Sequence, residues 1–102
     1  MHHVTAFALA GTTSIEVDGS LDVVAGYDLW RRVDAALRQG SRFIGIDLTR
    51  VTSASPEGVA GLERCCGAAI DARAALTLTG CSRPFRADLA ALESGRTRHL
   101  TR

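Results

Sequence analysis

Residues 43–66 read FIGIDLTRVTSASPEGVAGLERCC, and this stretch holds the two elements that decide the fold. Its first part is nearly all apolar, which is typical of a strand covered on both faces in an α/β sheet. Its last part starts a helix near Pro56, because Ser55 is a good N-cap and proline suits the first helical position. The stretch therefore predicts a strand over 42–48, a short surface loop, and a helix over 56–72.

A hairpin and a helix are predicted before this stretch. Residues 4–9 and 14–17 have strand patterns and are joined through Gly11, which favours a hairpin. Residues 18–20, Asp-Gly-Ser, then break the strand pattern. The strongest amphipathic helix of the sequence follows and stops at Gly40. Its apolar side repeats at helical spacing through Leu29, Trp30, Val33 and Leu37.

A strand and a last helix are predicted after this stretch. Residues 75–79, ALTLT, alternate as in a half-buried strand. Ser82 is expected to cap a helix that ends at Gly95, with Phe85, Leu89 and Leu92 as its buried stripe. Residues 96–102 form a short basic tail, either disordered or a frayed last strand. The expected order is β-β-α-β-α-β-α, with crossover helices that make parallel strand pairs and a hairpin that makes the sheet mixed.

Composition places the chain among ordinary folded proteins. Its 102 residues suit one domain, 1–102, and 46% hydrophobic with 23% charged residues is typical of soluble domains. A net charge of +1 gives no general attraction to nucleic acid or membrane. No apolar run approaches the roughly 18 residues of a membrane span. An odd count of three cysteines without a secretory signal favours reduced thiols and a cytoplasmic location.

The cysteines are predicted to be structural. Cys66 falls in register with Val59, Leu62 and Ile70, the expected core stripe of the helix, where a thiol behaves as a small hydrophobe. A redox role for Cys65 and Cys81 is the alternative, although neither has the activating neighbour that a thiolate needs.

The sequence lacks the motifs of an enzyme. All three histidines, His2, His3 and His99, lie near the ends of the chain, where a general base is not held rigidly and where disorder is common. There is no phosphate-binding loop, no GxGxxG and no Cys-x-x-Cys. We therefore expect no catalysis, no cofactor and no metal site.

Five short motifs in order resemble the STAS domain, the fold of anti-sigma factor antagonists. The resemblance covers residues 15–92 and predicts an α/β fold with a mixed sheet of four to five strands and three or four helices. The motifs are Gly19 with Leu21 and Asp22, the strand end 46–51, the loop ending in Gly58, the helix after it, and the strand 76–80 that reads LTLTG.

The resemblance implies a function and also shows a departure from it. In the family, the first serine of an Asp-Ser-Ser-Gly motif is phosphorylated by a kinase that is itself the anti-sigma factor, and phosphorylation ends binding. Here the motif stands as Ser55-Pro56-Glu57-Gly58, so Pro56 occupies the acceptor position. Proline has no hydroxyl, and the family's phosphorylation cannot occur there.

Three interpretations follow from this departure. The protein could be an antagonist that never switches off, although the single charge of Glu57 is a poor substitute for phosphate. The switch could have moved to Ser55 or Ser53. The domain could instead be architectural, like the STAS subunit that docks on the ATPase of phospholipid-trafficking ABC transporters, which is similar at Leu29-Trp30 and at residues 78–82.

The sequence therefore predicts a cytoplasmic STAS domain that binds another protein. The first choice of partner is an anti-sigma factor kinase, and the second is a transporter ATPase or a larger regulatory assembly. Exposed apolar residues at the start of the helix, such as Val59, are expected to anchor the partner. The predicted contact residues are Thr52, Ser53, Ser55, Pro56, Glu57, Gly58, Val59 and Leu62.

Overall fold

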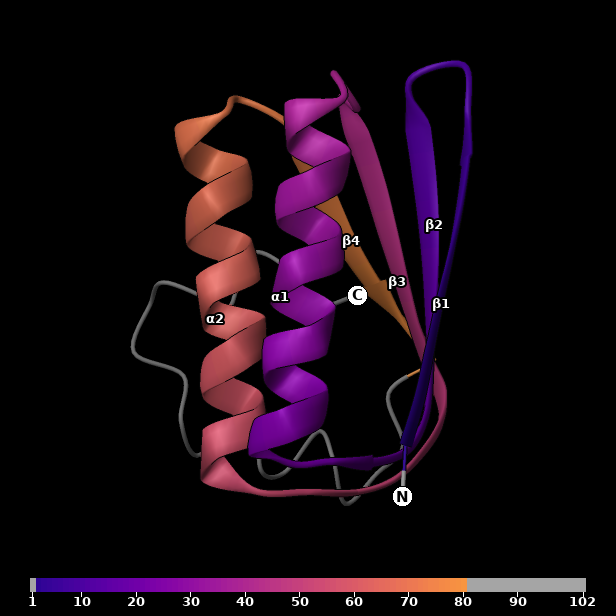
Figure 1. The fold of residues 1–102 in the computed structure, drawn as a ribbon, viewed down its shortest axis with the longest axis vertical. Coiled ribbons are helices and arrows are strands. Elements are labelled where there is room, and N and C mark those ends of the chain that lie inside the picture. Colours follow the sequence, from indigo (N-terminus) through magenta and orange to yellow (C-terminus); the bar gives the residue numbers. More distant parts are fainter. Residues whose placement is uncertain (1, 81–102) are drawn as a thin grey trace.

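The computed structural model describes residues 2–80, and it contains four strands and two helices (Figure 1). The predicted helix over 82–95 and the tail 96–102 lie outside the described residues. The order of the described elements matches the prediction as far as the last strand. In chain order they are β1 (His2–Leu9), β2 (Thr12–Leu21), α1 (Val23–Arg38), β3 (Phe43–Ala54), α2 (Pro56–Asp71) and β4 (Ala75–Thr79).

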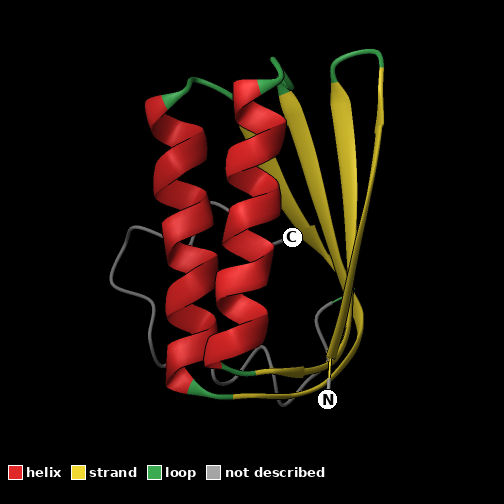
Figure 2. Ribbon diagram, in the orientation of Figure 1, coloured by secondary structure: helices red, strands yellow, loops and turns green. Residues whose placement is uncertain are grey.

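The fold is a mixed sheet with two helices packed on one face (Figure 2). The strand order is β1-β2-β3-β4, in which β1 and β2 are antiparallel and the other two pairs are parallel. The helices α1 and α2 run side by side and begin at the same end of the sheet (Figure 1). This arrangement confirms the predicted α/β class and mixed sheet.

The two central strands are longer than predicted. The break expected at residues 18–20 is wrong, because β2 continues to Leu21 and absorbs the irregularity as register shifts around Asp18 and Gly19. The expected loop before α2 is also mostly strand, since β3 continues to Ala54. The added residues of β2 pair with the added residues of β3, for example Ser20 with Ser53. Because each segment forms a strand by pairing with the other, the local sequence of either segment does not predict it.

The β1–β2 hairpin turns through two residues in the left-handed region. Ala10 has φ 51° and Gly11 has φ 81°, and the flanking residues Leu9 and Thr12 are opposite one another. Two consecutive positive φ angles are the mark of a type I′ turn, whose twist matches that of the strands. The predicted turn at Gly11 is confirmed.

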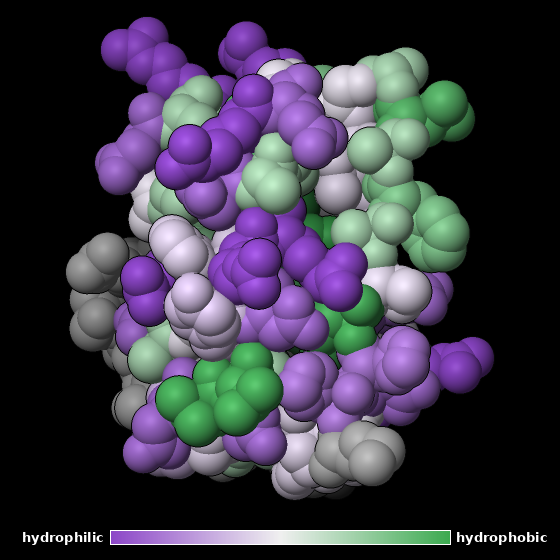
Figure 3. Space-filling view, viewed as in Figure 1, coloured by the Kyte–Doolittle hydropathy of each residue, from purple (hydrophilic) through white to green (hydrophobic). Residues whose placement is uncertain are grey.

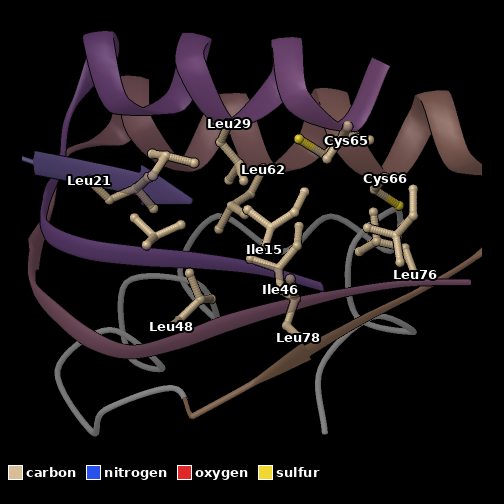
Figure 4. Close-up of a cluster of buried hydrophobic side chains, with 14 of the residues drawn as sticks. Ile15, Leu21, Leu29, Ile46, Leu48, Leu62, Cys65, Cys66, Leu76 and Leu78 are labelled. Carbon is tan, nitrogen blue, oxygen red and sulfur yellow. The ribbon is translucent and has the colours of Figure 1, made fainter. Parts of the chain in front are cut away.

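The core lies between the sheet and the two helices, as Figure 4 shows. Ile15, Ile46 and Leu78 point from the sheet toward Leu29 and Leu62 on the helices. The core stripe predicted for α2 is only partly correct. Val59, Leu62 and Cys66 are buried, but Ile70 is 54% exposed, and Cys65 is buried as well.

Glycines let the first turns of α1 and α2 come into backbone contact. A Cβ on Gly61 would lie 2.7 Å from the Cα of Gly26, and a Cβ on Gly26 would lie 3.1 Å from the carbonyl oxygen of Gly58. A Cβ on Gly58 would overlap the carbonyl oxygen of Leu21 at the end of β2. The close approach of the two helices therefore depends on residues without side chains.

We predict that Gly58→Ala lowers the free energy of unfolding by about 3 kcal/mol, because the new methyl group must displace backbone. Urea unfolding followed by circular dichroism measures the change. Gly45→Ala is the matched control, since its Cβ would lie 3.8 Å from the nearest atom, the Oγ1 of Thr77, and should change stability by less than about 1 kcal/mol. Equal effects of the two substitutions would contradict the packing described.

Candidate protein-binding site

The candidate site is the end of the molecule where both helices begin. Two strand-to-helix junctions meet there, β2 into α1 and β3 into α2. The backbone N–H of Ser55 donates to the carbonyl oxygen of Leu21 at 3.0 Å, which ties the second junction to the first. A backbone hydrogen bond therefore holds the two junctions together.

Each junction is closed by a side-chain N-cap. Asp22 accepts a hydrogen bond from the backbone N–H of Ala25 at 2.9 Å, and Ser55 accepts one from Gly58 at 3.1 Å. Pro56 stands at the first position of α2 with Glu57 beside it in the first turn, as predicted for this helix start. Both Pro56 and Glu57 are exposed. Residues 53–58, SASPEG, therefore contain both the end of β3 and the N-cap of α2.

The expected apolar anchor on α2 is wrong. Val59 is 1% exposed and Leu62 is 2% exposed, because both face the sheet and form part of the core. Gly58 is also buried, against the backbone of Leu21. These three predicted contact residues support the surface from below. Thr52, Ser53, Pro56 and Glu57 are the exposed members of the predicted set, and Ser55 is half-buried.

Exposed apolar side chains lie instead on the first turns of α1. Val23 is 59% exposed, Val24 is 60% exposed and Tyr27 is 55% exposed. Figure 3 shows hydrophobic surface over this end of the helices. The sequence-based prediction does not include these residues, because the predicted apolar stripe of this helix begins at Leu29. The signal that could have found them is a Val-Val pair directly after the Asp22 cap.

A shallow groove runs between the first turns of α1 and α2, next to these side chains. Gly26 and Gly61 line its floor, where the backbones of the two helices are in contact. Val23 and Tyr27 form one wall, and Glu57, Ala60 and Arg64 form the other. A groove with apolar side chains on its walls and one acid and one base at its rim can accept an apolar side chain from a protein partner.

The Arg64 wall of the groove is fixed by an aromatic contact. The guanidinium carbon of Arg64 lies 4.5 Å from the ring centroid of Trp30, within the range of a cation–π interaction. Tyr27 is also near this ring, with a centroid separation of 6.1 Å. Trp30 is half-buried and packs against the core, so it supports the groove from behind.

The hydroxyls of Ser53 and Ser55, the two predicted alternative phosphoacceptors near Pro56, differ in how accessible they are. Ser53 is exposed on β3, and its Oγ donates to the Oγ of Ser20 at 3.3 Å, a weak interaction. Ser55 uses its oxygen as the cap of α2. Ser53 is therefore the more available of the two predicted alternative phosphoacceptors.

Two aspartates near this end of the sheet are held in their charged forms. The hydrogen bond from the backbone N–H of Ala25 lowers the pKa of Asp22. Hydrogen bonds from the side chain and backbone of Thr49 lower the pKa of Asp47. A lowered folded-state pKa means that each carboxylate stabilises the fold above its unfolded pKa. That stabilisation is lost as the pH falls through the folded-state pKa.

The cysteines of α2 do not have the environment of reactive thiols. Cys65 and Cys66 are 0% and 2% exposed, and burial raises the pKa of Cys65 to about 12. A thiolate is the reactive form, so this environment argues against the redox alternative for Cys65. Cys81, the other cysteine of that alternative, lies outside the described residues.

We predict that iodoacetamide at pH 8 leaves Cys65 and Cys66 unmodified in the folded protein and modifies both after unfolding in guanidinium chloride. Peptide mass mapping distinguishes these two sites from Cys81. Modification of Cys65 at the same rate in folded and unfolded protein would contradict its burial.

The two described histidines, His2 and His3, lie in the strand β1. His2 and His3 were expected to be disordered, but both belong to β1, and His2 Nε2 lies 3.6 Å from a carboxylate oxygen of Asp28. Among residues 2–80, no three histidine, cysteine or acidic side chains are grouped in a way that could hold a metal ion. The same residues contain no helix of the length and apolar character required to cross a membrane.

Comparison with known proteins agrees with this fold. No curated protein sequence matches the chain. A family model described as "Mlab, STAS domain" matches residues 6–99. The chain belongs to the STAS domain family. This match confirms the prediction, made from five short motifs, that the chain is a STAS domain.

Solved STAS structures share the fold at low sequence identity. The phosphorylated Bacillus cell fate determinant SpoIIAA is 18% identical with a TM-score of 0.76, over 98% of this chain and 89% of that one. An anti-sigma factor antagonist from Mycobacterium paratuberculosis is 16% identical with a TM-score of 0.75, over 98% and 83%. A sulfate transporter family protein from Wolinella succinogenes is 16% identical with a TM-score of 0.70, over 92% and 75%. Antagonists and transporters thus share this fold, and the fold alone does not choose between them.

Proposed function

We propose that this STAS domain is a non-catalytic regulator that binds an anti-sigma factor of the kinase type. The contact surface is the end where α1 and α2 begin. The observation that carries the proposal is the position of Val23 and Tyr27, which are exposed and line one groove together with Glu57 of α2. Apolar side chains next to a rigid polar rim are the usual composition of a protein-binding surface.

Pro56 gives this surface a different regulation from that of the phosphorylated family members. Its side chain is exposed at the first position of α2, where the family's acceptor serine stands, and it carries no hydroxyl. Binding is therefore not switched off by phosphorylation at residue 56. Glu57 adds only one negative charge, so the surface stays competent to bind.

A relocated switch would be at Ser53 rather than Ser55. Phosphorylation of Ser55 would require its oxygen to leave the cap of α2, whereas Ser53 is exposed in β3. We predict that incubation with the partner kinase and ATP adds no phosphate to the domain, as measured by intact-protein mass spectrometry. A phosphate that is lost in Ser53→Ala and kept in Ser55→Ala would show instead that the switch has moved.

The second candidate partner is the ATPase of a phospholipid-trafficking ABC transporter. It is favoured by the Leu29-Trp30 pair, which resembles a pair in the STAS subunit of those transporters. Leu29 is buried in the core, and Trp30 contacts Arg64 on the wall of the groove. The same end of the domain would serve as the docking surface. The two candidates therefore differ in the partner and agree on the surface.

We predict that Val23→Lys weakens binding to the purified partner by about tenfold to thirtyfold, because a charge replaces an exposed apolar side chain that lines the groove. Isothermal titration calorimetry against an anti-sigma kinase and against a transporter ATPase measures both affinities. Ile70→Lys is the matched control, since Ile70 is 54% exposed near the far end of α2 and should bind normally.

Two outcomes would overturn parts of this proposal. Binding to the transporter ATPase and not to the kinase would replace the first partner by the second. Loss of binding in Ile70→Lys with normal binding in Val23→Lys would show that the surface is placed at the wrong end of the helices.

A further inference from the structure

The edge strand β1 offers a second interaction surface, separate from the start of the helices. In the described part of the chain β1 pairs only with β2, so its outer edge is unpaired. From Val4 to Leu9 this edge carries no charged residue and no proline, the devices that usually protect an exposed edge. Phe7 is 66% exposed and Leu9 is 81% exposed. Figure 3 shows this hydrophobic surface along the hairpin.

The hairpin turn determines which backbone groups of β1 point outward. In a two-residue type I′ hairpin, the residues that flank the turn form a hydrogen-bonded pair, here Leu9 and Thr12. Hydrogen-bonded and non-hydrogen-bonded positions alternate along an antiparallel pair. Therefore Phe7 and Leu9 bond to β2, whereas the N–H and C=O groups of Val4, Ala6 and Ala8 point away from the sheet.

We propose that β1 pairs antiparallel with β1 of a second copy of this chain, about a two-fold axis at Ala6. This register places Ala6 opposite Ala6 and Val4 opposite Ala8. Every outward group from Val4 to Ala8 then has a partner, which gives about six hydrogen bonds across the axis. The two sheets join into one continuous sheet with the helices of both copies on the same face.

The side chains favour a second copy as the occupant. The register brings Phe7 opposite Thr5, and Leu9 opposite His3, on the face of the sheet away from the helices. Aromatic and β-branched side chains pair favourably at such positions, and no like charges meet. A two-fold axis needs a surface that complements itself, and the uncharged segment from Val4 to Leu9 has this property.

Ala6→Pro tests the proposal most selectively. Proline removes an N–H that points outward and is tolerated at an edge strand, so the monomer should fold normally. Sedimentation equilibrium of the full chain should show a dimer for the unchanged protein and a monomer for Ala6→Pro. Val24→Lys, at the start of α1, is the control and should remain a dimer. A monomeric unchanged protein would overturn the proposal.

A second pair of variants keeps the test valid if the proline variant does not fold. Ala6→Lys places two like charges opposite each other across the axis and should weaken the dimer at least about tenfold, whereas Ala6→Thr should preserve it. Equal dimer affinity in the two variants would contradict the register.

Amide hydrogen exchange tests which occupant covers the edge. Protection of the Ala6 N–H should rise with protein concentration, because pairing with a second copy depends on concentration. Protection that is independent of concentration would mean that the edge is covered within one chain, and would overturn the proposal.

Discussion

The carbonyl group of Leu21 is the contact on which the rest of the site depends. It ends β2, accepts the N–H of Ser55 at 3.0 Å, and lies where a side chain on residue 58 would have to be. One peptide group therefore ties the start of α2 to the start of α1. The helices come close enough for Gly61 to touch Gly26, and the exposed ends of both helices become one rigid surface.

Because of this contact, the residues that the family resemblance groups into one binding motif have two different roles in the structure. Gly58, Val59 and Leu62 are buried and build the surface, while Pro56 and Glu57 are exposed on it. The family resemblance implies that phosphorylated relatives carry their acceptor serine at this exposed position. In this chain the position is occupied by Pro56, which suits the first position of a helix but has no hydroxyl that could be phosphorylated. The exposed apolar side chains next to it, Val23 and Tyr27, come from the neighbouring helix.

Much of the fold was predictable because its signals are local. The turn at Gly11, the cap at Ser55 and the alternation of residues 75–79 each require only a few neighbouring residues. The ends of β2 and β3 were missed because they stabilise each other across the sheet, and the Asp-Gly-Ser triplet locally favours a turn. The exposure of Val59 was misjudged because the side of a helix that faces the core depends on how the helix docks.

The candidate site was only half predictable for a related reason. The sequence located Pro56 in the family motif, but the apolar side chains beside it come from residues about 30 positions earlier. Only the fold brings those two segments together. In the same way, the unpaired edge of β1 becomes evident once the strand order is known.

We propose that one surface, made from the starts of both helices, binds the protein partner. Amide hydrogen exchange of the domain with and without its purified partner tests this claim directly. We expect new protection to appear together in residues 22–27 and 55–61. Protection confined to the face of the sheet away from the helices, with no change at the starts of α1 and α2, would contradict it.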